Sequence, residues 1–203
     1  LQPLEGEDPR DTARLWRRMF DDTVTIGRKG VLLRAISLVD TAFWDIKAKD
    51  ADQPLYKFLG AYDESVPVYA SGGYYHDSRE ELRTEVQRYV ERGHEAVKMK
   101  VGRLSPAEDA ERVSVVRETI GEERHLLLDA NGAYSHEHEA VRACRRFGEY
   151  DPYFIEEPVM PDSVDLMSRV NRAIDYPVAA GELEFSRYGF ADLVQRNAVD
   201  IVQ

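Results

Sequence analysis

The sequence predicts an α/β fold of the (β/α)-barrel type, with about six βα units following a smaller helical region. Three observations support this prediction. Short apolar runs alternate with helical segments from residue 66 onward, glycines stand where helices should end, and no Gly-x-Gly-x-x-Gly follows the first apolar run. Repeated βα units force parallel strands, which leaves a closed barrel or an open doubly wound sheet. The missing glycine motif weighs against the open sheet.

Residues 1–64 form the helical region. One helix is predicted around 11–21, and a longer one over 31–49, where apolar side chains recur at the three- and four-residue steps of one helical face. These side chains are Leu32, Ile36, Val39, Phe43 and Ile46. Pro54 and Gly60 punctuate the short segment that closes this region.

Residues 65–203 are expected to form the barrel portion. Buried strands are predicted at 66–70, 95–101, 125–129, 153–156, 177–181 and 198–202. Helices are predicted between them at about 79–92, 106–120, 136–147, 163–173 and 186–196. Helix ends are marked by Gly93, Gly121 and Gly148, and helix starts by Ser105-Pro106 and Ser135.

The composition limits the classes of partner and site. A formal net charge of −11 argues against nucleic acid or an anionic membrane as the main partner, whereas a bound cation would still allow an anionic small molecule. Cys144 is the single cysteine, so an internal disulfide, a Cys-based metal site and a redox pair are all excluded. With no apolar run of membrane-spanning length and no signal-peptide pattern, a cytoplasmic location is expected. Because the chain starts with Leu1 rather than Met, a longer natural polypeptide is expected.

Acidic residues end three successive predicted strands: Asp129, Glu156 and Glu182. In parallel βα folds the carboxyl ends of the strands meet at the active site, so these carboxylates should converge. Unpaired carboxylates would repel one another, but a divalent cation makes such a cluster favourable. An all-oxygen set without Cys or His suits Mg²⁺ or Mn²⁺ better than Zn²⁺.

Lys98 and Lys100 lie on the strand before these acids. Residues two apart on a strand face the same side, so both lysines point inward if the apolar residues beside them face the helices. Two neighbouring buried ammonium groups lower each other's pKa, which prepares a lysine to act as a general base near neutral pH.

Each of these residues also has a purely structural interpretation. A Lys-x-Lys pair is usually a solvated strand face, and Asp129 alone suits a turn or the start of a helix. Glu157 is either a support for the metal ligands or a surface charge, and Glu182 is also suited to capping the following helix. The combination of such signals at consecutive strand ends favours a functional site.

The ordered motifs resemble those of the enolase superfamily, specifically its mandelate racemase subgroup. They are Lys-Met-Lys at 98–100, Leu-Asp-Ala-Asn at 128–131, Ile-Glu-Glu-Pro at 155–158 and Ala-Gly-Glu at 180–182. The helix at 35–47 is similar to the motif that ends this family's capping domain, and residues 68–73 are similar to its first barrel strand. The likeness covers nearly the whole chain.

This resemblance implies roles for individual residues. Asp129, Glu156 and Glu182 would be the Mg²⁺ ligands, with Mn²⁺ as the alternative metal. Lys100 would be the base, and Lys98 would lie near the substrate carboxylate and lower the pKa of Lys100. Asn131 would contact substrate or solvent. The Glu-Glu-Pro sequence and the glutamate after Gly181 point away from the muconate lactonizing subgroup.

The resemblance also implies the organisation of the protein. Residues 1–64 would be the C-terminal portion of an α+β capping domain, and 65–203 the first six strands of a modified TIM-like barrel. The His–Asp dyad of this subgroup would lie beyond residue 203, and a homo-oligomer is expected.

The implied reaction is Mg²⁺-dependent abstraction of the proton α to a carboxylate through an enediolate. Dehydration of an acid sugar, an aldonate or aldarate, to a 2-keto-3-deoxy acid is the favoured outcome, and the expected partner is a small-molecule carboxylate. A racemase or epimerase of a 2-hydroxy acid is the first alternative. A non-catalytic metal-binding or assembly protein is the second, and it is disfavoured because a structural Mg²⁺ needs no buried lysine pair.

Overall fold

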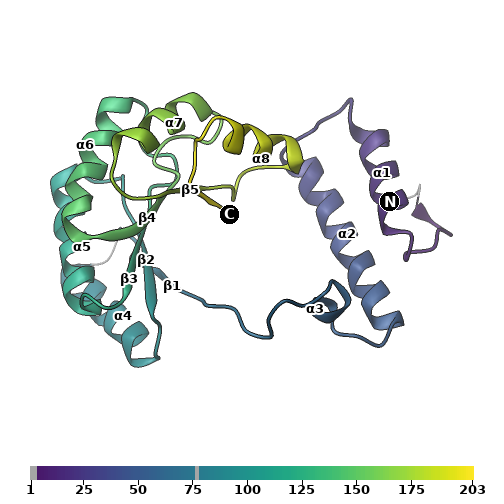
Figure 1. Cartoon of the computed structure of the whole chain (residues 1–203), viewed down its shortest axis with the longest axis horizontal. Coiled ribbons are helices and arrows are strands. Elements are labelled where there is room, and N and C mark those ends of the chain that lie inside the picture. Colours follow the sequence, from purple (N-terminus) through teal and green to yellow (C-terminus); the bar gives the residue numbers. More distant parts are fainter. Residues whose placement is uncertain (1–3, 76–77) are drawn as a thin grey trace. The chain divides into compact units, whose positions relative to one another are not determined.

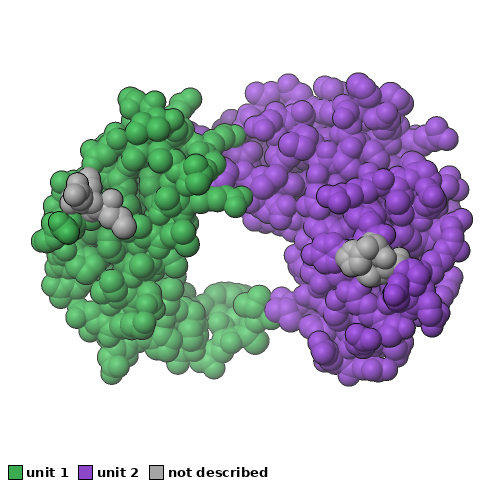
Figure 2. Space-filling model, turned by 180° about the vertical axis from the view of Figure 1, so that it is seen from behind, with its two compact units in different colours: residues 1–66 green, residues 67–203 purple. Residues whose placement is uncertain are grey.

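The computed structural model describes residues 4–75 and 78–203, and the chain divides into two compact units, residues 1–66 and 67–203 (Figure 2). None of the helices that the structure describes is both long and apolar enough to cross a bilayer.

The first unit consists of helices. These are α1 (Thr12–Thr23), α2 (Val31–Asp50) and the single-turn α3 (Leu55–Phe58) (Figure 1). The two longer helices confirm the predicted segments. Leu15 of α1 is buried together with Leu33 and Ile36 of α2. The predicted apolar face of α2 is buried only in part, since Ile46 is exposed.

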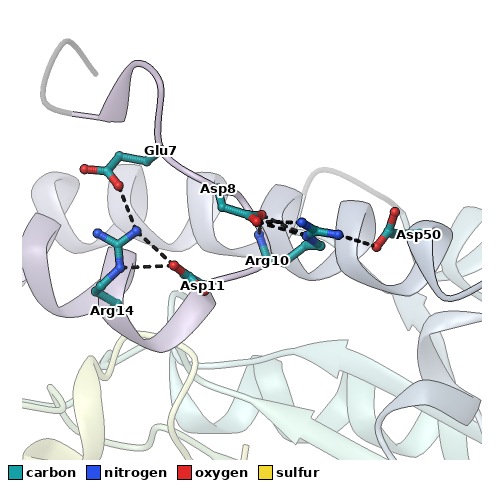
Figure 3. Close-up of polar contacts among 6 residues, drawn as sticks. All are labelled: Glu7, Asp8, Arg10, Asp11, Arg14 and Asp50. Atoms are coloured by element: carbon teal, nitrogen blue, oxygen red, sulfur yellow. Dashed lines mark hydrogen bonds and ion pairs between the residues drawn. The ribbon is translucent and has the colours of Figure 1, made fainter.

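Charged side chains fix the segment that precedes α1 (Figure 3). The guanidinium of Arg10 lies 2.7 Å from Asp8 and 3.1 Å from Asp50 of α2, and that of Arg14 lies 2.7 Å from Glu7. The side-chain hydrogen bond from Arg10, helped by its backbone N–H, lowers the pKa of Asp8 to about 2. These pairs are largely exposed, so they orient the segment more than they stabilise the unit.

The second unit is a parallel six-stranded sheet whose order β1-β2-β3-β4-β5-β6 follows the chain. The strands are β1 (Ala70–Gly72), β2 (Ala96–Lys100), β3 (His125–Asp129), β4 (Pro152–Glu156), β5 (Val178–Ala180) and β6 (Ile201–Val202). The helices are α4 (Arg79–Glu91), α5 (Pro106–Ile120), α6 (Glu137–Phe147), α7 (Val164–Ala173) and α8 (Ser186–Gln195), with a 3₁₀ turn at Gly148–Tyr150.

This alternation confirms the predicted α/β class. Sequential strand order is that of a barrel, whereas a doubly wound sheet reverses its order at a switch point. Helices α4 to α7 cover the outer face of the curved sheet (Figure 1).

Local sequence signals explain where the first two of these helices begin. Ser78 and Glu81 form a reciprocal capping box at the start of α4, and Ser105 and Glu108 form another at the start of α5. Each box satisfies backbone N–H groups that the first helical turn leaves without a partner.

The two faces of the sheet bury different residues. Val97, Met99 and Val101 belong to the main core between sheet and helices. On the opposite face, a smaller apolar cluster contains Leu127, Phe154 and Ala179. Because side chains alternate along a strand, Lys98 and Lys100 face the side of this smaller cluster.

The prediction of a first strand at 66–70 is wrong. The strand is Ala70–Gly72, and Val66 and Val68 are 78% and 67% exposed. Ala70 pairs with Val97, and β2 begins only one residue earlier, so the chain before residue 69 lies beyond the end of its neighbouring strand. Alternation of apolar residues alone does not reveal where a partner strand starts.

Candidate metal and proton-transfer site

Register brings Lys100, Asp129 and Glu156 together at the carboxyl ends of β2, β3 and β4. Lys100 lies opposite Asp129, and Asp129 lies opposite Glu156. The alignment of Asp129 with Glu156 depends on an irregularity in β4. Leu126 pairs with Pro152 but Leu127 pairs with Phe154, so Tyr153 is left out of the pairing. One residue more on β4 than on β3 is the geometry of a β-bulge.

The lysines form ion pairs with these acids. Nζ of Lys98 lies 2.5 Å from Oε2 of Glu156 and 3.2 Å from Oδ2 of Asp129. Nζ of Lys100 lies 2.5 Å from the same Oδ2 of Asp129. The side chain of Lys98 is 9% exposed and that of Lys100 is 17% exposed, so the pair is not a solvated strand face.

Opposing effects act on the charge of Lys98. Burial disfavours the ammonium, but the hydrogen bond to Glu156 and the charges of Asp129 and Glu156 outweigh it and raise the pKa of Lys98 above its ordinary value. This direction differs from the lowering predicted for two neighbouring ammonium groups, because the lysines face carboxylates as well as each other.

Glu157 is the least satisfied acid of the site. Its side chain is fully buried, and neither carboxylate oxygen has a hydrogen-bond partner among the described residues. Burial, followed by the charges of Glu182, Glu156 and Asp129, raises the pKa of Glu157 to about 7. Its φ of 40° is unusual for a residue with a side chain. The interpretation of Glu157 as a surface charge is therefore wrong.

Asn131 connects two of the predicted ligands. Its backbone N–H donates to Oδ1 of Asp129 at 3.1 Å, and its Nδ2 donates to Oε1 of Glu182 at 3.3 Å. Asp129 accepts this bond within a turn and does not cap α6, which begins at Glu137. Glu182 does not cap α8 either, since that helix has Phe185 at its N-cap and no side-chain cap bond.

The donor set suits a hard divalent cation. In residues 4–75 and 78–203, no group of three or more His, Cys, Asp or Glu side chains stands in an arrangement that could hold a metal ion, and Asp129 and Glu156 instead contact Lys98 and Lys100. Glu157 nevertheless lies in the field of three other carboxylates with its own oxygens unsatisfied. A cation among all-oxygen donors would relieve this repulsion, so the chemistry of the donor set, although not its present arrangement, fits the predicted metal.

A second buried charge pair next to this site was not predicted from the sequence. Asp109 and Arg112 of α5 are both buried, and Arg112 contacts the carbonyl oxygen of Lys100. Their signal was present, because an acid and a base three residues apart interrupt the buried face of a helix that otherwise carries Val113 and Val116.

Family comparisons match both units. A family model described as enolase C-terminal domain-like matches residues 81–203, and one described as mandelate racemase/muconate lactonizing enzyme, N-terminal domain, matches residues 2–60.

Individual relatives agree with this match. An arabinonate dehydratase from Saccharolobus solfataricus is 39% identical over 100% of this chain and 55% of its own length. An L-talarate/galactarate dehydratase from Salmonella typhimurium is 37% identical over 98% of this chain and 50% of its own length. The crystal structure of a racemase from Streptomyces coelicolor A3(2) with bound magnesium superimposes with a TM-score of 0.94 at 36% identity, covering 97% of this chain and 59% of that one.

The chain spans about half the length of the curated relatives it matches. The match extends over both compact units, and the sequential parallel strands with polar carboxyl ends agree with it. The chain therefore belongs to the mandelate racemase/muconate lactonizing enzyme family of the enolase superfamily.

Proposed function

We propose that the protein containing this chain removes the proton α to the carboxylate of an acid sugar, an aldonate or aldarate, and dehydrates it to a 2-keto-3-deoxy acid. The observation that carries the proposal is the buried pairing of Lys98 and Lys100 with Glu156 and Asp129 at adjacent strand ends. The dehydratases among the relatives support the choice of an acid sugar.

Asp129, Glu156 and Glu182 would hold Mg²⁺, with Mn²⁺ as the alternative. When bound, the cation supplies positive charge that stabilises the enediolate oxygens of the substrate. The magnesium in the structure of the Streptomyces coelicolor racemase supports this choice of metal.

The two lysines would have different tasks. The raised pKa of Lys98 keeps its ammonium charged, which suits binding of the substrate carboxylate. Lys100 has the more exposed side chain and would accept the α-proton as a neutral amine. The bond between the β-carbon and its hydroxyl oxygen would then break, the hydroxide would leave as water after gaining a proton, and the resulting enol would tautomerise to the 2-keto acid. Asn131 would contact the substrate beside Glu182.

The proposal extends to the organisation of the chain. Residues 1–64 would be the last part of a capping domain that shapes the substrate pocket, and residues 65–203 would supply barrel strands one to six. The enzyme would act as a homo-oligomer on a small-molecule carboxylate.

Racemisation or epimerisation of a 2-hydroxy acid is the second candidate, because it shares the first proton transfer and one similar structure is of a racemase. A non-catalytic metal-binding role is disfavoured, since a structural cation does not need two buried ammonium groups beside its ligands.

The deciding experiment incubates the complete protein with a panel of acid sugars in D₂O, with Mg²⁺ or with EDTA, and follows proton NMR spectra. A Mg²⁺-dependent 2-keto-3-deoxy product supports the dehydratase. Metal-dependent deuterium entry at the α-carbon without loss of water supports the racemase. A product that forms equally in EDTA, or equally with the Lys100→Met variant, contradicts both.

A further inference from the structure

Helix α5 buries an arginine and an aspartate one turn apart. Arg112 is 6% exposed and Asp109 is fully buried, and Nη1 of the arginine lies 3.4 Å from Oδ1 of the aspartate. A charge pair removed from water in this way needs further hydrogen bonds to be satisfied. Backbone atoms next to the candidate site supply these bonds to Nη1 and Nη2 of Arg112, while its Nε has no partner among the described residues.

Arg112 connects two segments of backbone. Its Nη1 donates to the carbonyl oxygen of Lys100 at 2.9 Å, and its Nη2 donates to the carbonyl oxygens of Gly73 at 2.6 Å and Tyr74 at 3.0 Å. The guanidinium also lies over the ring of Tyr75, 4.9 Å from its centroid. Gly73, Tyr74 and Tyr75 directly follow β1, so one side chain joins the ends of β1 and β2.

The position of this guanidinium follows from the divergence of the two strands. Among the described residues, β1 pairs with β2 as far as Gly72 opposite Met99, and Gly73 then turns with a φ of 63°. Lys100 is the next residue along β2, and Arg112 bonds its carbonyl where a longer β1 would have done so. The guanidinium therefore takes the place of a strand partner.

Carboxylates of α4 and α5 also bind the backbone of the two turns that Arg112 joins. Oε2 of Glu85 in α4 accepts the backbone N–H of Gly73 at 3.1 Å. Oδ2 of Asp109 accepts the backbone N–H of Gly102 at 2.7 Å, two residues after Lys100. The turn after β1 and the turn after β2 are thus each held by a helix carboxylate, and Arg112 joins them.

We propose that Arg112, oriented by Asp109, is a positioning residue that fixes the backbone of Lys100 relative to residues 73–75. This inference rests on the proposed proton transfer by Lys100. The Lys100 side chain reaches Oδ2 of Asp129 from this backbone, and a displacement of about 1 Å at a reacting group is enough to cost roughly a hundredfold in rate. Within the described residues, the hydrogen bonds of Arg112 go to backbone carbonyls and to Asp109, and not to the site carboxylates or the lysine ammonium groups.

The test compares substitutions at two arginines of α5 in the complete protein. Arg112→Lys keeps the charge but loses the planar fork that bridges two segments. Arg117→Lys is the matched control, because Arg117 also donates to backbone carbonyls, those of Gly121, Arg124, Tyr150 and Asp151. These carbonyls precede β3 and β4, whereas Lys100 ends β2. Melting temperature, Mg²⁺ affinity, and kcat and KM for α-proton exchange are measured for each.

We expect Arg112→Lys to lower kcat by roughly a hundredfold, while KM and Mg²⁺ affinity change little. The melting temperature of the Arg117→Lys variant should fall, but its kcat should stay at the wild-type value. The proposal is overturned if Arg112→Lys keeps the wild-type kcat, or if both variants lose kcat in proportion to their loss of melting temperature.

A readout that does not depend on activity separates this inference from the proposed function. In protein with ¹³C-labelled lysine, Arg112→Lys should shift the Cε resonance of Lys100, assigned by its absence in Lys100→Arg, and speed amide exchange at Val101, whose N–H donates to the carbonyl of Asp129. Absence of proton exchange in the wild type would refute the proposed function alone. Unchanged resonance and amide exchange in Arg112→Lys would refute the positioning role.

Discussion

Nζ of Lys100 lies 2.5 Å from Oδ2 of Asp129, the residue directly opposite it on the neighbouring strand. Lys98 contacts the same oxygen at 3.2 Å, so one carboxylate atom serves two ammonium groups. A metal ligated by Asp129 would share this carboxylate with both lysines. Metal binding and the protonation of the lysines are therefore expected to oppose each other.

Replacing Lys100 by Met should abolish α-proton exchange while leaving Mg²⁺ binding intact or tighter. The loss should be about 10²-fold to 10⁴-fold, the usual contribution of a general base, and removal of a nearby positive charge favours the cation. Exchange is measured by NMR in D₂O and binding by calorimetry. Lys57→Met, at an exposed position, is the control and should change neither. Weaker Mg²⁺ binding in Lys100→Met would contradict the argument.

Replacing Glu156 by Gln should destabilise the metal-free protein by about 3 kcal/mol, because the Lys98 ammonium would remain buried without its closest carboxylate. The double variant Lys98→Met/Glu156→Gln should recover part of that loss. Urea unfolding in EDTA gives the free energies of unfolding, and a double-mutant cycle gives the coupling. Additive effects of the two substitutions would show that the pair is not coupled.

Replacing Glu157 by Gln should stabilise the metal-free protein at pH 8 but not at pH 5. The pKa of Glu157 is raised from 4.5 to about 7, so the folded state favours its protonated form. The protonated carboxyl contributes to the free energy of unfolding below about pH 4.5, and this contribution is lost as the pH rises through about 7. The loss in the free energy of unfolding is about 3 kcal/mol. Unfolding in EDTA at both pH values measures the difference. An equal effect at pH 5 and pH 8 would contradict the raised pKa.

Replacing Arg10 by Ala should move the pKa of Asp8 from about 2 toward its ordinary value of 3.8, because the side-chain hydrogen bond is the largest cause of the lowering. The contribution of this pair to stability is present above about pH 3.8 and is lost as the pH falls toward 2. A carboxyl-carbon NMR titration measures the pKa. Arg17→Ala, which removes the partner of Asp21, is the control and should leave the titration of Asp8 unchanged.

Replacing Gly73 by Ala should cost more stability than replacing Gly93 by Ala. Both glycines have positive φ, 63° and 82°, so both substitutions carry backbone strain of about 1 kcal/mol. A Cβ at Gly73 would also lie 2.8 Å from Cβ of the buried Met99, whereas a Cβ at Gly93 meets open space. Overpacking adds about 1–3 kcal/mol. Chemical denaturation measures the two losses in the free energy of unfolding. Equal losses would show that Met99 shifts to accommodate the new Cβ without cost.

The sequence was sufficient to predict the elements that depend on local signals. The α5 helix was predicted over its observed span because Ser105 and Pro106 mark its start and Gly121 its end. The polar strand ends that carry Asp129, Glu156 and Lys100 could be identified because parallel strands bring their carboxyl ends together.

Features that depend on contacts between distant segments could not be predicted. The start of β1 is set by where β2 begins, which alternation at Val66 and Val68 does not reveal. The direction of the pKa shift of Lys98 depends on how many carboxylates reach it from the next two strands. The burial of Glu157 and the bonds of Arg112 to two segments likewise appear only when the chain is folded.

The irregularity in β4 corrects the phase of the strand. With it, Phe154 and Glu156 face the same side as Leu127 and Asp129, although the count of residues from Pro152 differs by one. If Tyr153 instead paired with Leu127 in an uninterrupted ladder from Pro152, Ile155 and not Glu156 would lie opposite Asp129. The bulge, and not only the amino-acid sequence of β4, therefore decides which side chain faces the site. A shift of one position would replace the carboxylate of Glu156 with the hydrocarbon side chain of Ile155.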